Sequence, residues 1–277
     1  MATNIMSMVK LGKDLLALAM ENKFLRRATK IYEKSVMEYG MSNPQKLLYP
    51  LTVIWHLTDR CNLRCSYCYN NSDDNTREEL NLQQKLDLAN QFVEMGLPSL
   101  HFSGGEAILS PDFWQVSERL TNGGIHVGLF TNGTTLNLEN IIRLKSVGLD
   151  EVAVSLDTLK QGKDKRFKSY YVTQVFDGIR NARDYGLRTT IVVTLTRSNL
   201  NELGDILRCA EELKVDEVDF FPYKPVGRGI KLEECLSQQE FDSILDAGKE
   251  LFFDNKDLIH IMPDAKFSRE IVLSDCN

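Results

Sequence analysis

The chain has 277 residues, of which 43% are hydrophobic and 26% are charged, a balance typical of a globular protein and unlike a disordered or collagen-like chain. Its formal net charge is −6 and its Lys and Arg residues are scattered, which argues against a nucleic-acid partner. No apolar run reaches the ~18 residues of a membrane span, and the N-terminus lacks a signal-peptide pattern. We therefore expect a cytoplasmic location with reduced thiols.

The first 45 residues differ from the rest of the chain. Apolar residues recur there at helical spacing among Lys, Arg and Glu, which predicts one long or two short amphipathic helices. We expect residues 1–45 to form a helical extension and residues 46–277 to form the main domain. The extension either packs against the main domain or docks on a partner or membrane surface, since it also carries several basic residues such as Lys10, Lys13 and Arg26.

Strand-like and helix-like segments alternate in the main domain. The predicted strands cover residues 51–57, 100–103, 126–131, 151–156, 189–195 and 217–221. The predicted helices cover residues 82–95, 112–122, 138–146, 173–185 and 203–213, and glycine follows most of them. This order predicts an α/β fold with a parallel sheet and helices outside it, either an open sheet or a barrel. In both folds, functional loops gather at the C-terminal ends of the strands.

Three cysteines follow the first predicted strand directly. Cys61, Cys65 and Cys68 have the spacing C-x3-C-x2-C, which places three thiolates on one short loop. An iron–sulfur cluster normally takes four cysteine ligands, so a group of three indicates a [4Fe–4S] cluster with one iron open to a small molecule. Two other kinds of site would also use cysteines. A zinc site could combine the three cysteines with His56, although zinc ligands usually come as two separated pairs. A disulfide fits poorly with an odd local count and no secretory context.

The segment from Cys61 to Cys68, with Tyr67 before the last cysteine, resembles the signature of the radical S-adenosylmethionine (SAM) superfamily. The resemblance extends over about residues 51–263. It implies a partial (β/α)6 TIM-type barrel in which SAM chelates the open iron of the [4Fe–4S] cluster. It also implies reductive cleavage of SAM to a 5′-deoxyadenosyl radical, and a reductant partner such as ferredoxin or flavodoxin. The cofactors then carry the chemistry, while the protein positions and shields them. Tyr67 is expected in the SAM site.

Gly104, Gly105 and Glu106 end the second predicted strand. Two glycines permit backbone angles that other residues avoid and let a ligand approach the main chain, and Glu106 adds an anion that would hold an ammonium group. In the resembled family, this motif binds the methionyl amine of SAM. Members commonly have Pro after the Glu, whereas this chain has Ala107.

Polar residues also end the third and fourth predicted strands. Asn132 lies in a Thr-Asn-Gly turn that either has a structural role or lines the SAM pocket. Ser155 and Asp157 alternate along the fourth strand and could face one side, offering a hydroxyl and a carboxylate to a ribose. The resemblance places a ribose-binding serine here and a polar or basic group shortly after it. Arg166 is the nearest basic candidate, although the local sequence departs from the His-Asp and Arg of many relatives.

Two prolines and a Gly-Arg-Gly stretch follow the sixth predicted strand and bring Arg228 to a flexible loop, where it could clamp a substrate carboxylate. The stretch resembles radical SAM enzymes of the SPASM and Twitch type, including those that modify haem precursors and ribosomal peptides. The resemblance implies a ribosomal peptide, a protein or a tetrapyrrole precursor as substrate.

The remaining cysteines do not complete a second cluster. Cys209 and Cys235 fall at apolar positions and are expected to be buried. Cys276 lies where the first auxiliary-cluster cysteine of the extended relatives occurs, so either the chain is truncated or it lacks an auxiliary cluster. Two functions from other classes stay open: a non-catalytic iron–sulfur scaffold for electron transfer or sensing, and a zinc-stabilised binding module.

Overall fold

Seven parallel strands form one sheet in which the spatial order of the strands equals their order in the chain. The computed structural model describes residues 22–39, 46–73, 78–160, 171–237, 239–240 and 259–261. The strands are β1 (Thr52–Thr58), β2 (Ser99–Gly104), β3 (His126–Thr131), β4 (Glu151–Ser155), β5 (Arg188–Leu195), β6 (Glu217–Pro222) and β7 (Ile259–Ile261).

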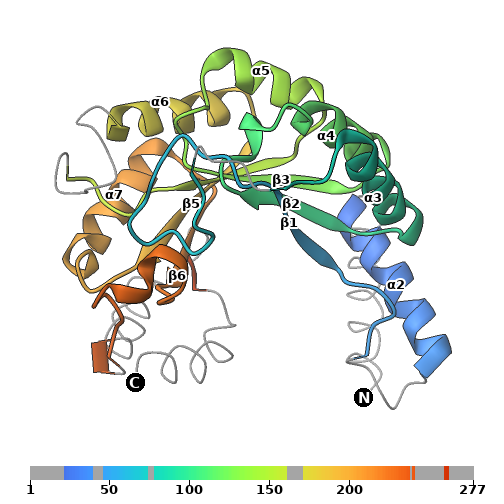
Figure 1. The fold of residues 1–277 in the computed structure, drawn as a ribbon, viewed down its shortest axis with the longest axis horizontal. Helices are drawn as coiled ribbons and strands as arrows, with labels where there is room; N and C mark the ends of the chain where they lie inside the picture. Colours follow the sequence, from blue (N-terminus) through green and yellow to red (C-terminus); the bar gives the residue numbers. More distant parts are fainter. Residues whose placement is uncertain are drawn as a thin grey trace, which may run out of the picture.

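Helices connect the strands and cover the outer face of the sheet (Figure 1). They are α2 (Lys23–Tyr39), α3 (Leu82–Met95), α4 (Phe113–Asn122), α5 (Leu138–Ser146), α6 (Tyr171–Asp184) and α7 (Leu203–Leu213), with short 3-10 segments η1 (Ala107–Leu109), η2 (Leu200–Glu202) and η3 (Gly227–Lys231). Local sequence sets the ends of α3. Asn81 and Gln84 form a reciprocal capping box at its start, and Gly96 ends it in the left-handed conformation, with a φ of 77°.

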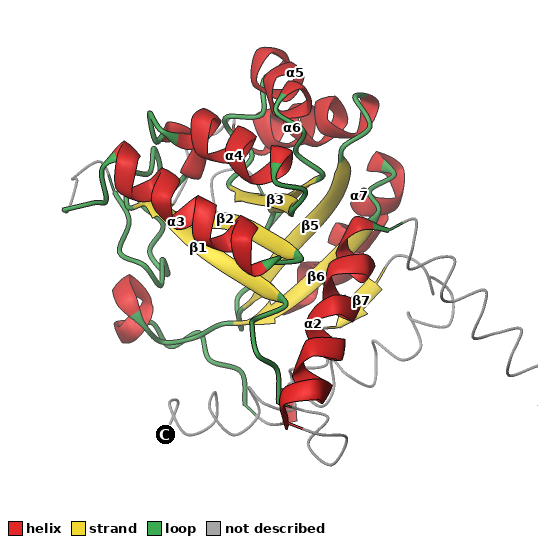
Figure 2. Cartoon of the chain, turned by 90° about the vertical axis from the view of Figure 1, so that its right-hand side faces the viewer, coloured by secondary structure: helices red, strands yellow, loops and turns green. Residues whose placement is uncertain are grey.

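The sheet curves into an arch with the helices on its convex side and an open concave side (Figures 1 and 2). Side chains alternate between the two faces along each strand. Leu100 and Phe102 of β2 are fully buried under the helices, where the Phe102 ring lies 5.2 Å from that of Phe113. His101 and Ser103, between and after them, therefore face the concave side.

The predicted fold is confirmed: the structure is the α/β, partial TIM-type barrel expected from the alternating pattern and the resemblance. The bounds of the predicted strands and helices match within two residues. One addition is β7, which extends the sheet beyond the six predicted strands.

Helix α2 packs against the N-terminal side of the barrel. Lys23 Nζ lies 2.6 Å from Asp150 Oδ2, Arg27 donates to the carbonyl oxygens of Leu97 and Gly123, and Ile31 is 2% exposed. Residues 1–21 and 40–45 lie outside the described part, so the division of the chain at residue 45 stays a prediction. Within the described ranges, no helix combines the length and the apolar character needed to cross a bilayer.

Candidate functional site

The three predicted metal ligands lie on the loop that follows β1, at the C-terminal ends of the strands. The loop closes on itself: the Cys61 N–H donates to the carbonyl oxygen of Asp73 at 2.8 Å, and residues 60 and 73 form a parallel bridge. A turn brings the Cys68 N–H to the carbonyl of Cys65, at 3.3 Å. The sequence thus places all three thiols on one folded loop, as expected, and we call residues 59–73 the cysteine loop.

The Gly-Gly-Glu segment after β2 fixes the start of the cysteine loop. The Gly105 N–H donates to the carbonyl of Thr58 at 2.8 Å, and the Glu106 N–H donates to that of Arg60 at 2.7 Å. Gly104 has a φ of +118°, and a Cβ atom on Gly104 or Gly105 would collide with these same carbonyl groups. The two glycines are therefore required because two stretches of main chain approach each other more closely than a side chain allows.

The carboxylate of Glu106 is completely buried and turned toward the end of β3. It accepts hydrogen bonds from the hydroxyl of Thr131 at 2.7 Å, the N–H of Asn132 at 2.9 Å and the hydroxyl of Thr135 at 3.2 Å. Burial raises the pKa of Glu106, and these hydrogen bonds act in the opposite direction. The role of Glu106 in holding the ammonium group of SAM stays a prediction, and in this structure its carboxylate joins the ends of β2 and β3.

Asn132 lies between this buried carboxylate and the cysteines. Its amide nitrogen is 4.0 Å from the Cys61 sulfur and donates to the side-chain oxygen of Asn62 at 2.9 Å. Asn62 in turn donates to the Thr134 hydroxyl at 2.8 Å. The turn after β3 therefore contacts the cysteine loop directly, and Asn132 is adjacent to the predicted cluster site.

The end of β4 holds the loop through Tyr67. The Tyr67 hydroxyl donates to the carboxylate of Asp157, which also accepts from the backbone N–H of Thr194 on β5. Burial raises the pKa of Asp157 to about 7. Asp157 was expected to offer its carboxylate to a ribose beside Ser155; it instead anchors the aromatic residue of the cysteine motif. Ser155 ends β4 and is half-buried on the concave side, consistent with its predicted place.

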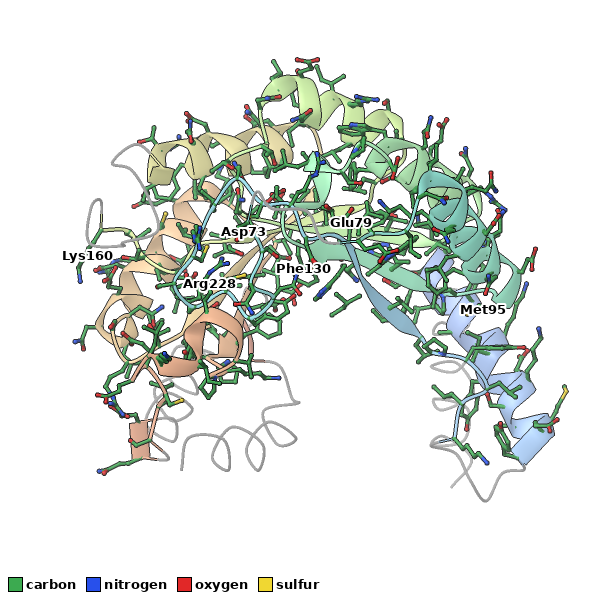
Figure 3. All side chains as sticks on the ribbon, in the orientation of Figure 1. Asp73, Glu79, Met95, Phe130, Lys160 and Arg228 are labelled. Carbon is green, nitrogen blue, oxygen red and sulfur yellow. The ribbon has the colours of Figure 1, made fainter. Side chains whose placement is uncertain are left out.

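Arg228, in η3 after β6, also contacts the cysteine loop (Figure 3). Its Nε donates to the carbonyl of Cys65 at 2.8 Å, and its backbone N–H donates to that of Cys68 at 3.0 Å. Gly227 has a φ of +59°, and a Cβ there would collide with the carbonyls of Cys68 and Tyr69. Arg228 was expected to clamp a substrate carboxylate; the structure shows that it clamps the cysteine loop.

The chemistry of the three thiols fits an iron–sulfur cluster. Burial raises the pKa of the Cys61 thiol, and the negative charges of Glu106 and Cys68 act in the same direction. Thiolate ligands in such surroundings need a positively charged partner, which iron supplies. The zinc alternative would use His56, whose Nε2 lies 2.9 Å from the Tyr69 hydroxyl, so this nitrogen would have to leave a hydrogen-bond partner to bind a metal.

The other predicted residues lie elsewhere. Cys209 lies in α7 against the hydrophobic core and Cys235 lies in a loop, and both are half-buried, whereas the apolar pattern predicted that they would be buried. Arg166 and Cys276 lie outside the described residues, so their roles stay predictions. Sequence reasoning missed the contacts of Arg228, Asp157 and Thr131, because each joins strand ends that are far apart in the chain.

Curated proteins and solved structures similar to this chain point to one kind of enzyme. Fe-coproporphyrin III synthase from Methanosarcina barkeri is 31% identical over 70% of this chain and 49% of its own length. PqqA peptide cyclase from Bradyrhizobium diazoefficiens is 24% identical over 83% of this chain and 62% of its own length. The chain therefore spans about half to three fifths of these relatives.

The fold comparison agrees with the topology described above. The structure of Streptococcus suis SuiB bound to S-adenosylmethionine superposes with a TM-score of 0.68, at 15% identity, over 86% of this chain and 55% of the other. The family model of the radical SAM superfamily matches residues 55–210. This range begins in β1, includes the cysteine loop and ends in α7. The chain belongs to the radical SAM superfamily.

Proposed function

We propose that this chain is the catalytic core of an enzyme that cleaves SAM reductively and abstracts a hydrogen atom from an organic substrate. One observation carries the proposal: the ends of β2, β3, β4 and β6 all contact the loop that holds Cys61, Cys65 and Cys68. A loop bearing three thiols and fixed from so many sides is suited to hold a reactive metal centre in one orientation.

The cofactors of the superfamily are a [4Fe–4S] cluster and S-adenosylmethionine. We assign the cluster to Cys61, Cys65 and Cys68, which leave one iron open. When bound there, the two cofactors together supply a 5′-deoxyadenosyl radical, which takes hydrogen from the substrate. We assign the SAM site to the same edge of the sheet. Its expected residues are Tyr67, Gly104, Gly105, Glu106, Asn132, Ser155 and Arg166.

The chain's own residues have three tasks in this proposal. Arg228 and the Tyr67–Asp157 pair hold the cysteine loop against the strand ends, so the cluster has a fixed position. The buried Glu106 joins the turn after β3 to the loop and keeps Asn132 near Cys61. The sheet and the helices on its convex side cover the back of the site, so water reaches the radical from fewer directions (Figure 1).

For the substrate we propose a peptide or a carboxylated tetrapyrrole. Support comes from the names of two similar proteins, a PqqA peptide cyclase and an Fe-coproporphyrin III synthase. We further propose that a cytoplasmic ferredoxin or flavodoxin supplies the electron. A scaffold that binds the cluster without chemistry would leave SAM intact under reducing conditions, and a zinc module would be colourless.

The test is anaerobic reconstitution of the full chain with iron and sulfide, followed by reduction with dithionite in the presence of SAM. We expect 5′-deoxyadenosine and methionine to form, and the yield to rise with the correct substrate. Cys65→Ala should abolish both products, whereas Cys209→Ala, a cysteine in α7 outside the site, should leave them unchanged. Brown protein that binds SAM and never cleaves it would refute the proposal in favour of a scaffold.

A further inference from the structure

We propose that His101, His126 and Glu151 form a second metal site, for one divalent ion of the zinc class, at the opposite end of the barrel from the cysteine loop. The three residues lie on the neighbouring strands β2, β3 and β4. One nitrogen or oxygen atom from each lies within 4.8 Å of the others. Two imidazoles and a carboxylate are a ligand set that zinc uses, with a fourth position left for water.

The register of the sheet brings these side chains together on the concave face. His101 pairs with Gly128, and Gly128 pairs with Glu151, so the three positions form one row across β2, β3 and β4. Gly128 has no side chain, and a Cβ there would collide with the His101 ring. The His101 Nε2 therefore reaches across the glycine and contacts the Glu151 carboxylate directly.

The third ligand comes from the first residue of β3. His126 Nε2 lies 3.5 Å from Glu151 Oε2. A tetrahedral ion with bonds of about 2.0–2.1 Å separates its ligand atoms by about 3.4 Å, so this pair is already at a suitable spacing. The His101–Glu151 contact is closer and needs only a small opening to admit an ion. The Phe130 ring, on the concave side of β3 (Figure 3), lies 5.5 Å from the His101 ring and limits its rotation.

The Asp150 carboxylate lies beside the His126 ring, on the side away from Glu151. The other ring nitrogen, Nδ1, lies 3.6 Å from Asp150 Oδ2. Asp150 is itself held by Lys23 Nζ at 2.6 Å and by the N–H of Val127 at 2.8 Å. Histidines that bind metals commonly donate their second N–H to a carboxylate, which fixes the ring and raises its basicity. Asp150 is in position for this role.

The charges around the site leave it able to accept a cation. Glu151, Asp150 and Glu217 carry negative charge, and Lys23 and Arg188 carry positive charge. Arg188 Nε is 3.7 Å from Glu151 Oε2, yet its Nη2 is 2.6 Å from Glu217 Oε2. Arg188 therefore keeps Glu217 as an ionic partner when Glu151 binds a metal ion. The side chains of His101, His126 and Glu151 are 18%, 25% and 18% exposed, so an ion can reach them.

The test uses the full chain with Cys61, Cys65 and Cys68 replaced by serine, so that the cysteine loop cannot bind the probe. After chelator treatment the protein is titrated with Co²⁺ and followed by calorimetry and visible absorption. We expect one Co²⁺ per chain and the absorption of a tetrahedral N/O site. His101→Gln and Glu151→Gln should each weaken the affinity tenfold or more, and His56→Gln, on the same face, should not.

Circular dichroism verifies that each variant is folded. Should His101→Gln and Glu151→Gln both be unfolded, Asp150→Asn decides, because loss of the carboxylate behind His126 should also weaken the affinity about tenfold or more. A chain that takes up no Co²⁺, or folded variants that bind it as tightly as their parent, would overturn the proposal and leave two histidines that contact the Glu151 carboxylate. Because the test protein lacks the three cysteines, its outcome does not depend on the proposed function.

Discussion

Arg228→Ala is expected to loosen the cysteine loop without unfolding the barrel. The change removes the hydrogen bond from the guanidinium to the carbonyl of Cys65, and leaves the backbone bond from residue 228 to Cys68. A hydrogen bond from a charged donor contributes about 1.5–3 kcal/mol. Since about 1.4 kcal/mol is a factor of ten, the population of loops that have lost their ordered conformation should rise about 10- to 150-fold.

The assay follows the release of iron from the reconstituted protein to a chelator, through the loss of visible absorbance. If release proceeds from the opened loop, Arg228→Ala should accelerate it by the same factor. Arg228→Lys should release iron nearly as fast as Arg228→Ala, because lysine has a methylene group and no donor at the position of the arginine Nε. Arg208→Ala is the matched control, since Arg208 is exposed in α7 and its ion pair within the described residues is with Asp205. Equal release rates for Arg228→Ala and the unaltered protein would refute the role of this arginine.

Three further substitutions test the packing around the site. Gly227→Ala should prevent stable iron incorporation, measured as iron content, because its Cβ would collide with carbonyls of the cysteine loop. Gly204→Ala is the control: its Cβ would make only an ordinary contact of 3.9 Å with the Arg208 side chain, so urea unfolding should show a free energy of unfolding about 0.5–1 kcal/mol higher. Thr131→Val removes a hydrogen-bond donor to the buried Glu106 and should lower the free energy of unfolding by about 1–3 kcal/mol in urea titrations. A free energy of unfolding equal to that of the unaltered protein would contradict this. Burial raises the pKa of Asp157 from 3.8 to about 7, so the folded chain holds this proton more tightly than the unfolded chain. The contribution of protonated Asp157 to the free energy of unfolding is complete below pH 3.8. It is lost as the pH rises to about 7, at up to about 1.4 kcal/mol per pH unit. Unfolding titrations across this pH range should therefore show a smaller slope for Asp157→Asn than for the unaltered protein; parallel curves would contradict the assignment.

The sequence predicted the fold well because its signals are local. Alternating apolar residues mark the strands, and residues such as Asn81 and Gly96 end the helices within a few residues of where the pattern stops. The cysteine spacing likewise predicted which loop would carry the thiols. These features need no knowledge of which distant segments meet.

The contacts that complete the site could not be predicted in the same way. Arg228 is 163 residues from the carbonyl to which it donates, and Tyr67 is 90 residues from Asp157. A polar residue at a strand end can face a ligand or another loop, and the sequence does not distinguish these two arrangements. We predicted from the sequence that Asp157 and Arg228 would bind a ligand, whereas in the structure both side chains contact the cysteine loop. The His101–Glu151 contact depends on strand register across Gly128, which hydrophobic patterns do not specify.

The most direct measurement of the central claim is the low-temperature electron paramagnetic resonance spectrum of the reduced, reconstituted protein before and after addition of SAM. With three cysteine ligands and one open iron, we expect about four irons per chain and a spectrum that changes when SAM is added. Cys61→Ala should lose the signal. A cluster whose spectrum is identical with and without SAM would contradict the claim that one of its irons is open to the cofactor.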